Sequence, residues 1–120
     1  MKLVHLKTID STNAEALRLL AAAQNVRDLD QTVIAADEQS AGRGRLKRAF
    51  YSPAKTGVYF TAIYAPAAPI DDPALLTACA AVAVCRSLKE FFGVEAKIKW
   101  VNDVYVNNKK VCGIIGRAHV

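Results

Sequence analysis

The chain has 120 residues, 52% of them hydrophobic, and a formal net charge of +5 at pH 7, which is typical of one soluble globular domain with its own core and suits an anionic ligand. It contains no apolar run of about 18 residues, which excludes a membrane helix, and its charged start excludes a signal peptide. Its three cysteines, Cys79, Cys85 and Cys112, lack CxxC spacing, which predicts reduced, buried thiols of a cytoplasmic protein rather than a disulfide framework or a zinc site.

The first predicted elements are a strand over residues 3–9 and a helix that begins near Thr12. Residues 3–9 roughly alternate apolar and polar side chains, as a strand does. Thr12 and Glu15 have the spacing of a capping box. A strand that ends at a helix N-terminus also leaves N–H groups and hydroxyls pointing outward. Ser11 and Thr12 are therefore either helix caps alone or part of a polar-ligand site.

A short apolar strand, residues 32–36, leads into the Gly/Arg loop, residues 40–48, in which glycines alternate with arginines. Glycine lets the backbone approach a ligand closely, and arginine offers forked donors that match carboxylate or phosphate oxygens. Such a loop either holds phosphates, binds nucleic acid, or is simply solvated. Of the aromatic residues that follow, Phe50 and Tyr51, we expect Tyr51 to anchor the loop to the core.

The second half of the chain predicts a strand, a long helix and a final set of strands. Residues 57–65 are rich in aromatic and β-branched side chains. A helix should run from residue 73 to about residue 92, preceded by acids and ended by Gly93. Residues 74–84 are apolar on nearly all sides, which predicts that this part of the helix is largely buried.

The last elements are a strand over residues 95–101 and a hairpin, residues 104–115, whose turn is Asn107-Asn108. Asparagine tolerates the positive φ angles that a two-residue type I′ turn needs. The order of all the elements predicts an α+β domain with a mixed or antiparallel sheet and helices packed on one face.

Four segments of the chain resemble one family, the biotin protein ligases (biotin–[acetyl-CoA-carboxylase] ligases). Each is weak alone, but together they follow the family's order and close to its spacing. They are Ser-Thr-Asn at residues 11–13; Gln-Ser-Ala-Gly-Arg-Gly-Arg at residues 39–45, closing on Ser-Pro at residues 52–53; Lys-Trp-Val-Asn-Asp-Val-Tyr at residues 99–105; and Lys-Val-Cys-Gly-Ile at residues 110–114. The resemblance implies the family's catalytic-domain fold and a two-step reaction. Biotin and MgATP form biotinyl-5′-adenylate, and a lysine of a biotin carboxyl carrier protein then takes the biotin.

The resemblance also implies which positions bind the cofactors biotin and ATP. The hydroxyl and amide groups of Ser11, Thr12 and Gln39 suit a buried ureido ring, which needs hydrogen-bond partners. The implied binding residues are Ser11, Thr12, Asn13, Gln39, Gly42, Arg43, Gly44, Arg45, Lys110 and Gly113.

Four residues are expected to carry the catalysis: Arg43, Arg45, Lys110 and Asp103. The three cations would stabilise negative charge that grows on the α-phosphate, while the loop closes and excludes water. Asp103 either holds Mg²⁺, orients a cation, or is only a turn residue. No protein ligand for a metal is assigned.

The chain departs from the family pattern in places. Lys47 stands where glycine is usual, Phe50 where tryptophan is usual and Val101 where proline is common, so we expect a stiffer loop and a weaker adenine stack. The family's glutamate-containing strand, its Gly-x-Gly-x-Asn segment and its small C-terminal domain do not follow residue 115, and no winged helix precedes the domain. Residues 1–120 are therefore expected to be a partial catalytic domain with an unpaired sheet edge.

Three alternatives accompany this hypothesis. A truncated, impaired module would bind biotin without turning it over. A lipoate ligase or octanoyltransferase would share the architecture, although the Gly-Arg-Gly-Arg segment disfavours it. Nucleic-acid binding through residues 43–48 would weaken steeply with salt and ignore biotin. The favoured reading has no nucleic-acid or membrane partner and allows a homodimer.

Overall fold

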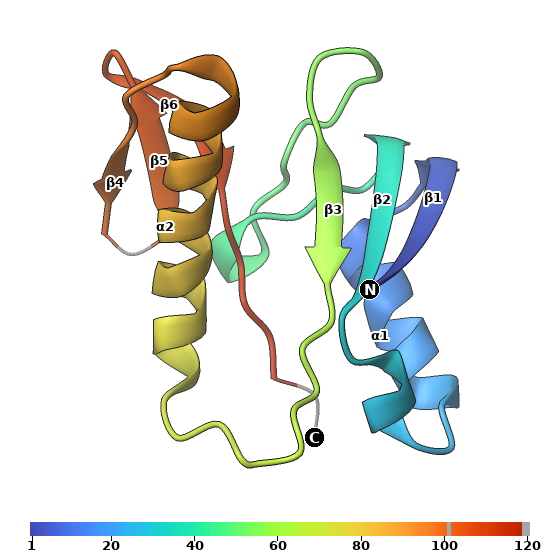
Figure 1. The fold of residues 1–120 in the computed structure, drawn as a ribbon. Helices are drawn as coiled ribbons and strands as arrows, with labels where there is room; N and C mark the ends of the chain where they lie inside the picture. Colours follow the sequence, from blue (N-terminus) through green and yellow to red (C-terminus); the bar gives the residue numbers. More distant parts are fainter. Residues whose placement is uncertain (101, 119–120) are drawn as a thin grey trace. The chain divides into compact units, whose positions relative to one another are not determined.

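The computed structural model describes residues 1–100 and 102–118. These residues form two compact units, residues 1–69 and residues 70–118, each described here by itself. The first unit contains β1, α1, β2 and β3, and the second contains α2, β4, β5 and β6 (Figure 1). Within the described ranges, neither α-helix has the length and hydropathy that a membrane span requires.

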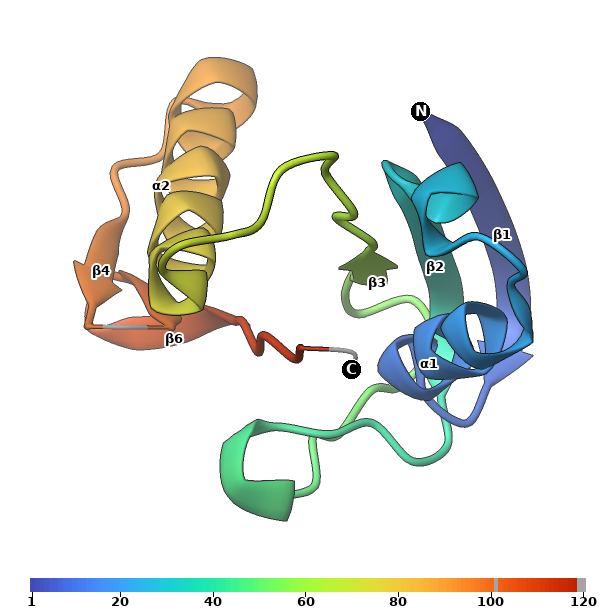
Figure 2. The same ribbon diagram turned by 90° about the horizontal axis from the view of Figure 1, so that it is seen from below.

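The first unit is a mixed three-stranded sheet with a helix on one face. The strands β1 (Lys2–Ile9), β2 (Thr32–Gln39) and β3 (Tyr59–Ala62) lie in the order β1-β2-β3. β1 is parallel to β2, and β3 is antiparallel to β2. Parallel neighbours need a crossover connection, here made by α1 (Thr12–Ala22) and the 3₁₀ helix η1 (Val26–Leu29). α1 lies against the sheet (Figure 2). The one parallel and one antiparallel pairing confirm the predicted mixed sheet.

The core of this unit forms between α1 and the central strand. Ile34 of β2 is fully buried, and Ala16 of α1 and Ile63 pack beside it. β2 runs three residues further than the sequence predicts. Its end stays paired, because Gln39 lies opposite Ile9 of β1 and forms an isolated bridge with Ser52. The partly buried residues around this core are Val4, Leu6, Leu19, Leu20, Leu29 and Ala65.

The second unit is an antiparallel sheet with α2 (Pro73–Phe92) packed against it. Its strands β4 (Lys97–Lys99), β5 (Asp103–Val106) and β6 (Lys109–Gly113) lie in the order β4-β5-β6. Gly93 ends the helix with a φ of 65°, as expected of a C-terminal glycine. Asn107 and Asn108 join β5 to β6 with φ angles of 50° and 63°, so both asparagines have the positive φ that the predicted turn requires.

The predicted burial of α2 is wrong over most of its length. In this helix only Ala81 is fully buried, whereas Leu75 is 55% exposed and Cys79 lies at the surface. β4 and β5 pack against one side of α2, and apolar composition alone does not say how many sides are covered. All three cysteines are free, as predicted, but their predicted burial is wrong, because Cys79 is exposed and Cys85 and Cys112 are only half-buried. Val101, one of the departures from the family pattern, lies outside the described residues.

Candidate functional site

The first element of the site is the N-terminus of α1. Ser11, not Thr12, caps this helix, and its Oγ accepts a hydrogen bond from the Ala14 N–H at 3.2 Å. The predicted capping box is therefore one residue out of register, and Glu15 instead pairs with Arg18. The Thr12 side chain is therefore not used for capping and bonds to other groups. Both Ser11 and Thr12 are buried.

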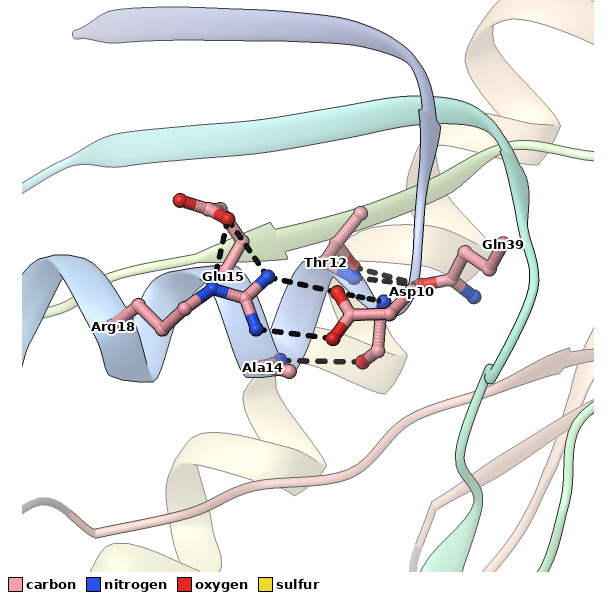
Figure 3. A network of polar contacts seen from close by, with 7 residues as sticks. Asp10, Thr12, Ala14, Glu15, Arg18 and Gln39 are labelled. Carbon is pink, nitrogen blue, oxygen red and sulfur yellow. Dashed lines mark hydrogen bonds and ion pairs between the residues drawn. The ribbon is translucent and has the colours of Figure 1, made fainter.

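Thr12 binds the side chain of Gln39 at the end of β2 (Figure 3). The Gln39 Oε1 accepts hydrogen bonds from the Thr12 N–H at 2.8 Å and from the Thr12 Oγ1 at 3.2 Å. The Thr12 hydroxyl also lies 2.9 Å from the Oγ1 of Thr61 on β3. Three elements of the first unit thus meet at one buried hydroxyl. Thr61 was not predicted, because its partner becomes visible only once β3 is placed beside β2.

The other end of the Gln39 side chain supports the Gly/Arg loop. Its Nε2 donates to the Oγ of Ser52 at 2.9 Å, and that hydroxyl donates to the Phe50 carbonyl at 2.9 Å. Gly42 packs against this cluster so closely that a Cβ there would lie 2.5 Å from both the Phe50 O and the Ser52 Oγ. One amide therefore links the start of α1 to the base of the loop.

The loop itself is folded as a short antiparallel ladder. The Phe50 N–H donates to the Gly42 carbonyl at 2.8 Å, and the Gly44 N–H donates to the Arg48 carbonyl at 2.7 Å. The short segment η2 (Arg45–Lys47), in which Leu46 and Lys47 have positive φ, makes the turn. Within the described residues no carboxylate pairs with Arg43, so its cation is open to an anionic ligand.

The predicted anchor of this loop is wrong. Tyr51 is 87% exposed, whereas Ser52 is 2% exposed. The hydroxyl of Ser52 is held by Gln39 and by the Phe50 carbonyl. The loop is therefore fastened by a buried polar group and not by an aromatic ring.

A second network, which the sequence reasoning missed, surrounds the junction of β1 and α1. Arg18 donates to both carboxylate oxygens of Asp10, at 2.8 and 3.0 Å, and to Glu15 Oε2 at 2.8 and 3.1 Å (Figure 3). The Ser11 N–H also donates to Asp10 Oδ1 at 2.7 Å. The bond from Arg18, and then that from Ser11, lowers the pKa of Asp10 to about 2. The spacing of Glu15 and Arg18 is the one sequence signal for this network.

In the second unit, the predicted residues lie on the neighbouring strands β5 and β6. The Nζ of Lys110 lies 3.0 Å from the Oδ1 of Asp103, and Gly113 lies opposite Asp103 in the register. Asp103 is the first residue of β5, which disfavours its interpretation as a turn residue. Its ion pair favours the interpretation that it orients the Lys110 cation.

The residues described by the structure contain no group of three or more His, Cys, Asp or Glu side chains that could hold a metal ion.

Burial raises the pKa of the Cys112 thiol, and the nearby Cys85 adds to this effect. A raised pKa keeps a thiol protonated and a poor nucleophile.

Residues 6–119 match the biotin/lipoate A/B protein ligase family. The chain belongs to this family. It is 42% identical over 84 residues to the bifunctional ligase/repressor BirA of Bacillus subtilis, covering 70% of this chain and 26% of BirA. It is also 33% identical over 109 residues to the biotin–[acetyl-CoA-carboxylase] ligase of Mycobacterium tuberculosis, covering 88% of this chain and 40% of that enzyme.

The fold agrees with that of a solved member. The biotin protein ligase from Aquifex aeolicus in complex with biotin and ATP superposes with a TM-score of 0.79 at 32% identity, covering 95% of this chain and 45% of that one. The predicted fold class is therefore confirmed. The chain spans less than half the length of each of these three relatives.

The family's predicted site residues fall into one group in each unit. In the first unit, Gln39 contacts both Thr12 and Gly42, Ser11 precedes Thr12 and caps α1, and Asn13 lies in the first turn of this helix. Arg43, Gly44 and Arg45 follow in the loop. In the second unit, the group consists of Asp103, Lys110 and Gly113.

Proposed function

We propose that this chain binds biotin and ATP and catalyses the ATP-dependent attachment of biotin to a lysine of a biotin carboxyl carrier protein. The observation that carries the proposal is the Gln39 side chain, which bonds to Thr12 at one end and to Ser52 at the other. Thr12 and Gln39, two of the residues that the family resemblance assigns to biotin, are thus held in one hydrogen-bonded cluster. Preorganised groups of this kind lower the ordering cost of binding.

The buried polar groups of the first unit suit the ureido ring of biotin. The ring carries one carbonyl acceptor and two N–H donors, so it needs partners of both kinds. Thr12 has a hydroxyl that can donate or accept, and Gln39 uses one of its two amide hydrogens on Ser52. The other amide hydrogen of Gln39 can serve a ligand.

The adenylation step needs charge stabilisation and no protein nucleophile. A carboxylate oxygen of biotin attacks the α-phosphorus of ATP, the bond to the β-phosphate oxygen breaks, and pyrophosphate leaves. Arg43, Arg45 and Lys110 would stabilise the charge that develops on the phosphates. The acceptor lysine amine then attacks the acyl carbon and AMP leaves. A closed Gly/Arg loop would keep water from hydrolysing the adenylate.

Mg²⁺ would enter this reaction with ATP. Magnesium is commonly bound by one or two carboxylates together with substrate phosphates, and holding Mg²⁺ is one of the roles that the sequence leaves open for Asp103. Its ion pair with Lys110 at 3.0 Å competes with a metal, so we assign no protein ligand. The carrier protein as acceptor, a homodimer and a cytoplasmic location stay predictions.

The decisive experiment is transfer of labelled biotin, with MgATP, to an apo biotin carrier domain, using the full chain and an Arg43→Ala variant. The proposal predicts labelling by the wild type that disappears in the variant. Arg43 is exposed, and exposed positions rarely affect stability by more than about 0.5 kcal/mol. The melting temperature of the variant should therefore stay unchanged.

Two further results separate the alternatives. Biotin binding without labelling of the acceptor would favour a binding module over a ligase. The absence of both biotin binding and acceptor labelling, in a folded sample, would overturn the proposal. A variant whose melting temperature falls as far as that of a core mutant would show that Arg43 is structural.

A further inference from the structure

Arg18 makes an unusually complete set of bonds for a half-exposed side chain. Its guanidinium donates four hydrogen bonds, two to Asp10 and two to Glu15. The pair with Asp10 is bidentate, the geometry that most restricts the orientation of a carboxylate. Arg18 is not among the predicted site residues, and the proposed reaction does not use it.

Asp10 is the point at which β1, α1 and the Gly/Arg loop are joined. Its Oδ1 accepts the Ser11 N–H at 2.7 Å, which fixes the residue that caps α1. Its backbone carbonyl accepts the Ala41 N–H at 2.7 Å, and the preceding carbonyl, that of Ile9, accepts the Ser40 N–H at 3.0 Å. Asp10 therefore bonds to both the helix start and Ala41 of the loop.

The energetics of this pair favour a role in geometry over a role in stability. The side chains of Arg18 and Asp10 are 50% and 46% exposed, and ion pairs in water contribute little to folding. However, a carboxylate held from two sides keeps one orientation, and small displacements of binding groups are costly to affinity and rate. Loss of Arg18 would leave the fold intact and loosen what Asp10 holds.

We propose that Arg18 is a positioning residue, which holds Asp10 so that the N-terminus of α1 and the start of the Gly/Arg loop keep the geometry that biotin binding requires. The inference rests on the proposed function for its ligand. The positioning itself can be measured without a ligand.

The test compares Arg18→Ala with Arg27→Ala, which removes an arginine from η1 in the same unit. Amide hydrogen exchange at Ser11 and Ala41, followed by NMR, reports the positioning. Calorimetric titration with biotin reports the affinity, and thermal melting reports stability. Arg18→Ala should speed exchange at both amides and weaken biotin binding about tenfold, with a melting temperature close to that of Arg27→Ala.

A double-mutant cycle tests whether Arg18 acts through Asp10. Asp10→Asn and the double variant Asp10→Asn/Arg18→Ala should each lose about the same factor in affinity as Arg18→Ala. Multiplied losses would overturn the idea, since they would mean independent roles. Arg18→Lys keeps the charge without the fork, so full recovery of affinity by this variant would show that charge alone matters.

The outcomes separate the two proposals. Unchanged exchange and unchanged affinity in Arg18→Ala would overturn the positioning role while leaving the proposed function intact. Failure of the wild type to bind biotin would overturn the proposed function and the ligand assigned here. Even then, faster exchange at Ser11 and Ala41 in Arg18→Ala than in the wild type would still support Arg18 as the residue that positions them.

Discussion

At the scale of single residues, Gly42 is needed for space and not for a left-handed backbone. An added Cβ would meet the Phe50 carbonyl and the Ser52 Oγ at 2.5 Å and the Gln39 Nε2 at 2.9 Å. All three of these atoms take part in the hydrogen bonds at the base of the Gly/Arg loop. Gly44 is different, because a Cβ there would find its nearest neighbour at 3.7 Å, an ordinary contact.

Gly42→Ala should therefore destabilise the chain by about 1–3 kcal/mol, the usual cost of overpacking, and should also weaken biotin binding. Gly44→Ala is the matched control and should change the free energy of unfolding by less than about 0.5 kcal/mol. Urea denaturation measures both. Equal stability of the two variants would mean that the base of the loop is not packed as described.

Lys47 occupies a conformation that suits the glycine usual in the family. Its φ is 62°, and that of the neighbouring Leu46 is 56°. A side chain in the left-handed region costs roughly 1–2 kcal/mol. Lys47→Gly should consequently be more stable than Lys47→Ala by about 1 kcal/mol in urea denaturation. No difference between the two would argue against the left-handed turn in solution.

At the scale of elements, the connection between β1 and α1 decides which side chains are free to bind a ligand. Because Ser11 caps the helix, Thr12 can reach Gln39 and Thr61. The capping-box pattern pointed to Thr12, because Glu15 follows it by three residues, although Ser11 is an equally good cap. The side-chain bonds of Asp10 settle the register, because Asp10 holds the Ser11 N–H.

This connection predicts a dependence of stability on acid. The pKa of Asp10 is lowered from 3.8 to about 2 in the folded state, so the folded chain binds fewer protons than the unfolded chain between these values. The resulting stabilisation is small, because both side chains of the pair are half-exposed. It is present above about pH 4 and is lost as the pH falls through 2. Asp10→Asn should therefore show a smaller fall in melting temperature between pH 4 and pH 2 than the wild type.

The control for this experiment is Asp28→Asn in η1, because the structure shows no ion pair of Asp28 within the described ranges. That variant should keep the acid dependence of the wild type. An Asp10→Asn curve parallel to the wild-type curve would mean that the ion pair with Arg18 does not form in solution.

At the scale of the whole molecule, the predicted site residues are divided between two compact units. Ser11, Thr12, Gln39 and the loop arginines belong to residues 1–69, and Lys110 belongs to residues 70–118. Binding of biotin to the folded state alone increases the free energy of unfolding by mass action, by about 2.7 kcal/mol at a hundred times the Kd, and so raises the melting temperature. The proposal requires that residues of both units contribute to this shift.

Lys110→Ala should therefore reduce the biotin-dependent rise in melting temperature, and Lys109→Ala, one residue away on β6, should not. Lys109 is exposed, and no ion pair to it is present in the part of the chain that the structure describes. Differential scanning fluorimetry with and without biotin measures the effect. An equal rise in both variants would remove Lys110 from the site.

Much of the fold could be predicted from local sequence signals. The acids expected before α2 include its N-cap, Asp72, whose side chain accepts the Ala74 N–H. The terminal Gly93 and the Asn107-Asn108 turn also behave as expected, because each acts through its own backbone angles or its nearest neighbours. The order of strands and helices followed from the same signals. The extent to which α2 is buried could not be predicted, because an apolar composition favours burial but does not say which elements pack against the helix.

The sequence alone determined the family, the α+β order and the residue types that we expect to bind anions, because these depend on motifs and short-range spacing. Only the tertiary structure decided how those residues are used. It joined Gln39 to both Thr12 and Ser52, excluded Tyr51 as the anchor and connected Arg18 to the loop through Asp10. These contacts join residues separated along the chain, and hydrogen bonds of this kind depend on which strands pair and in which register.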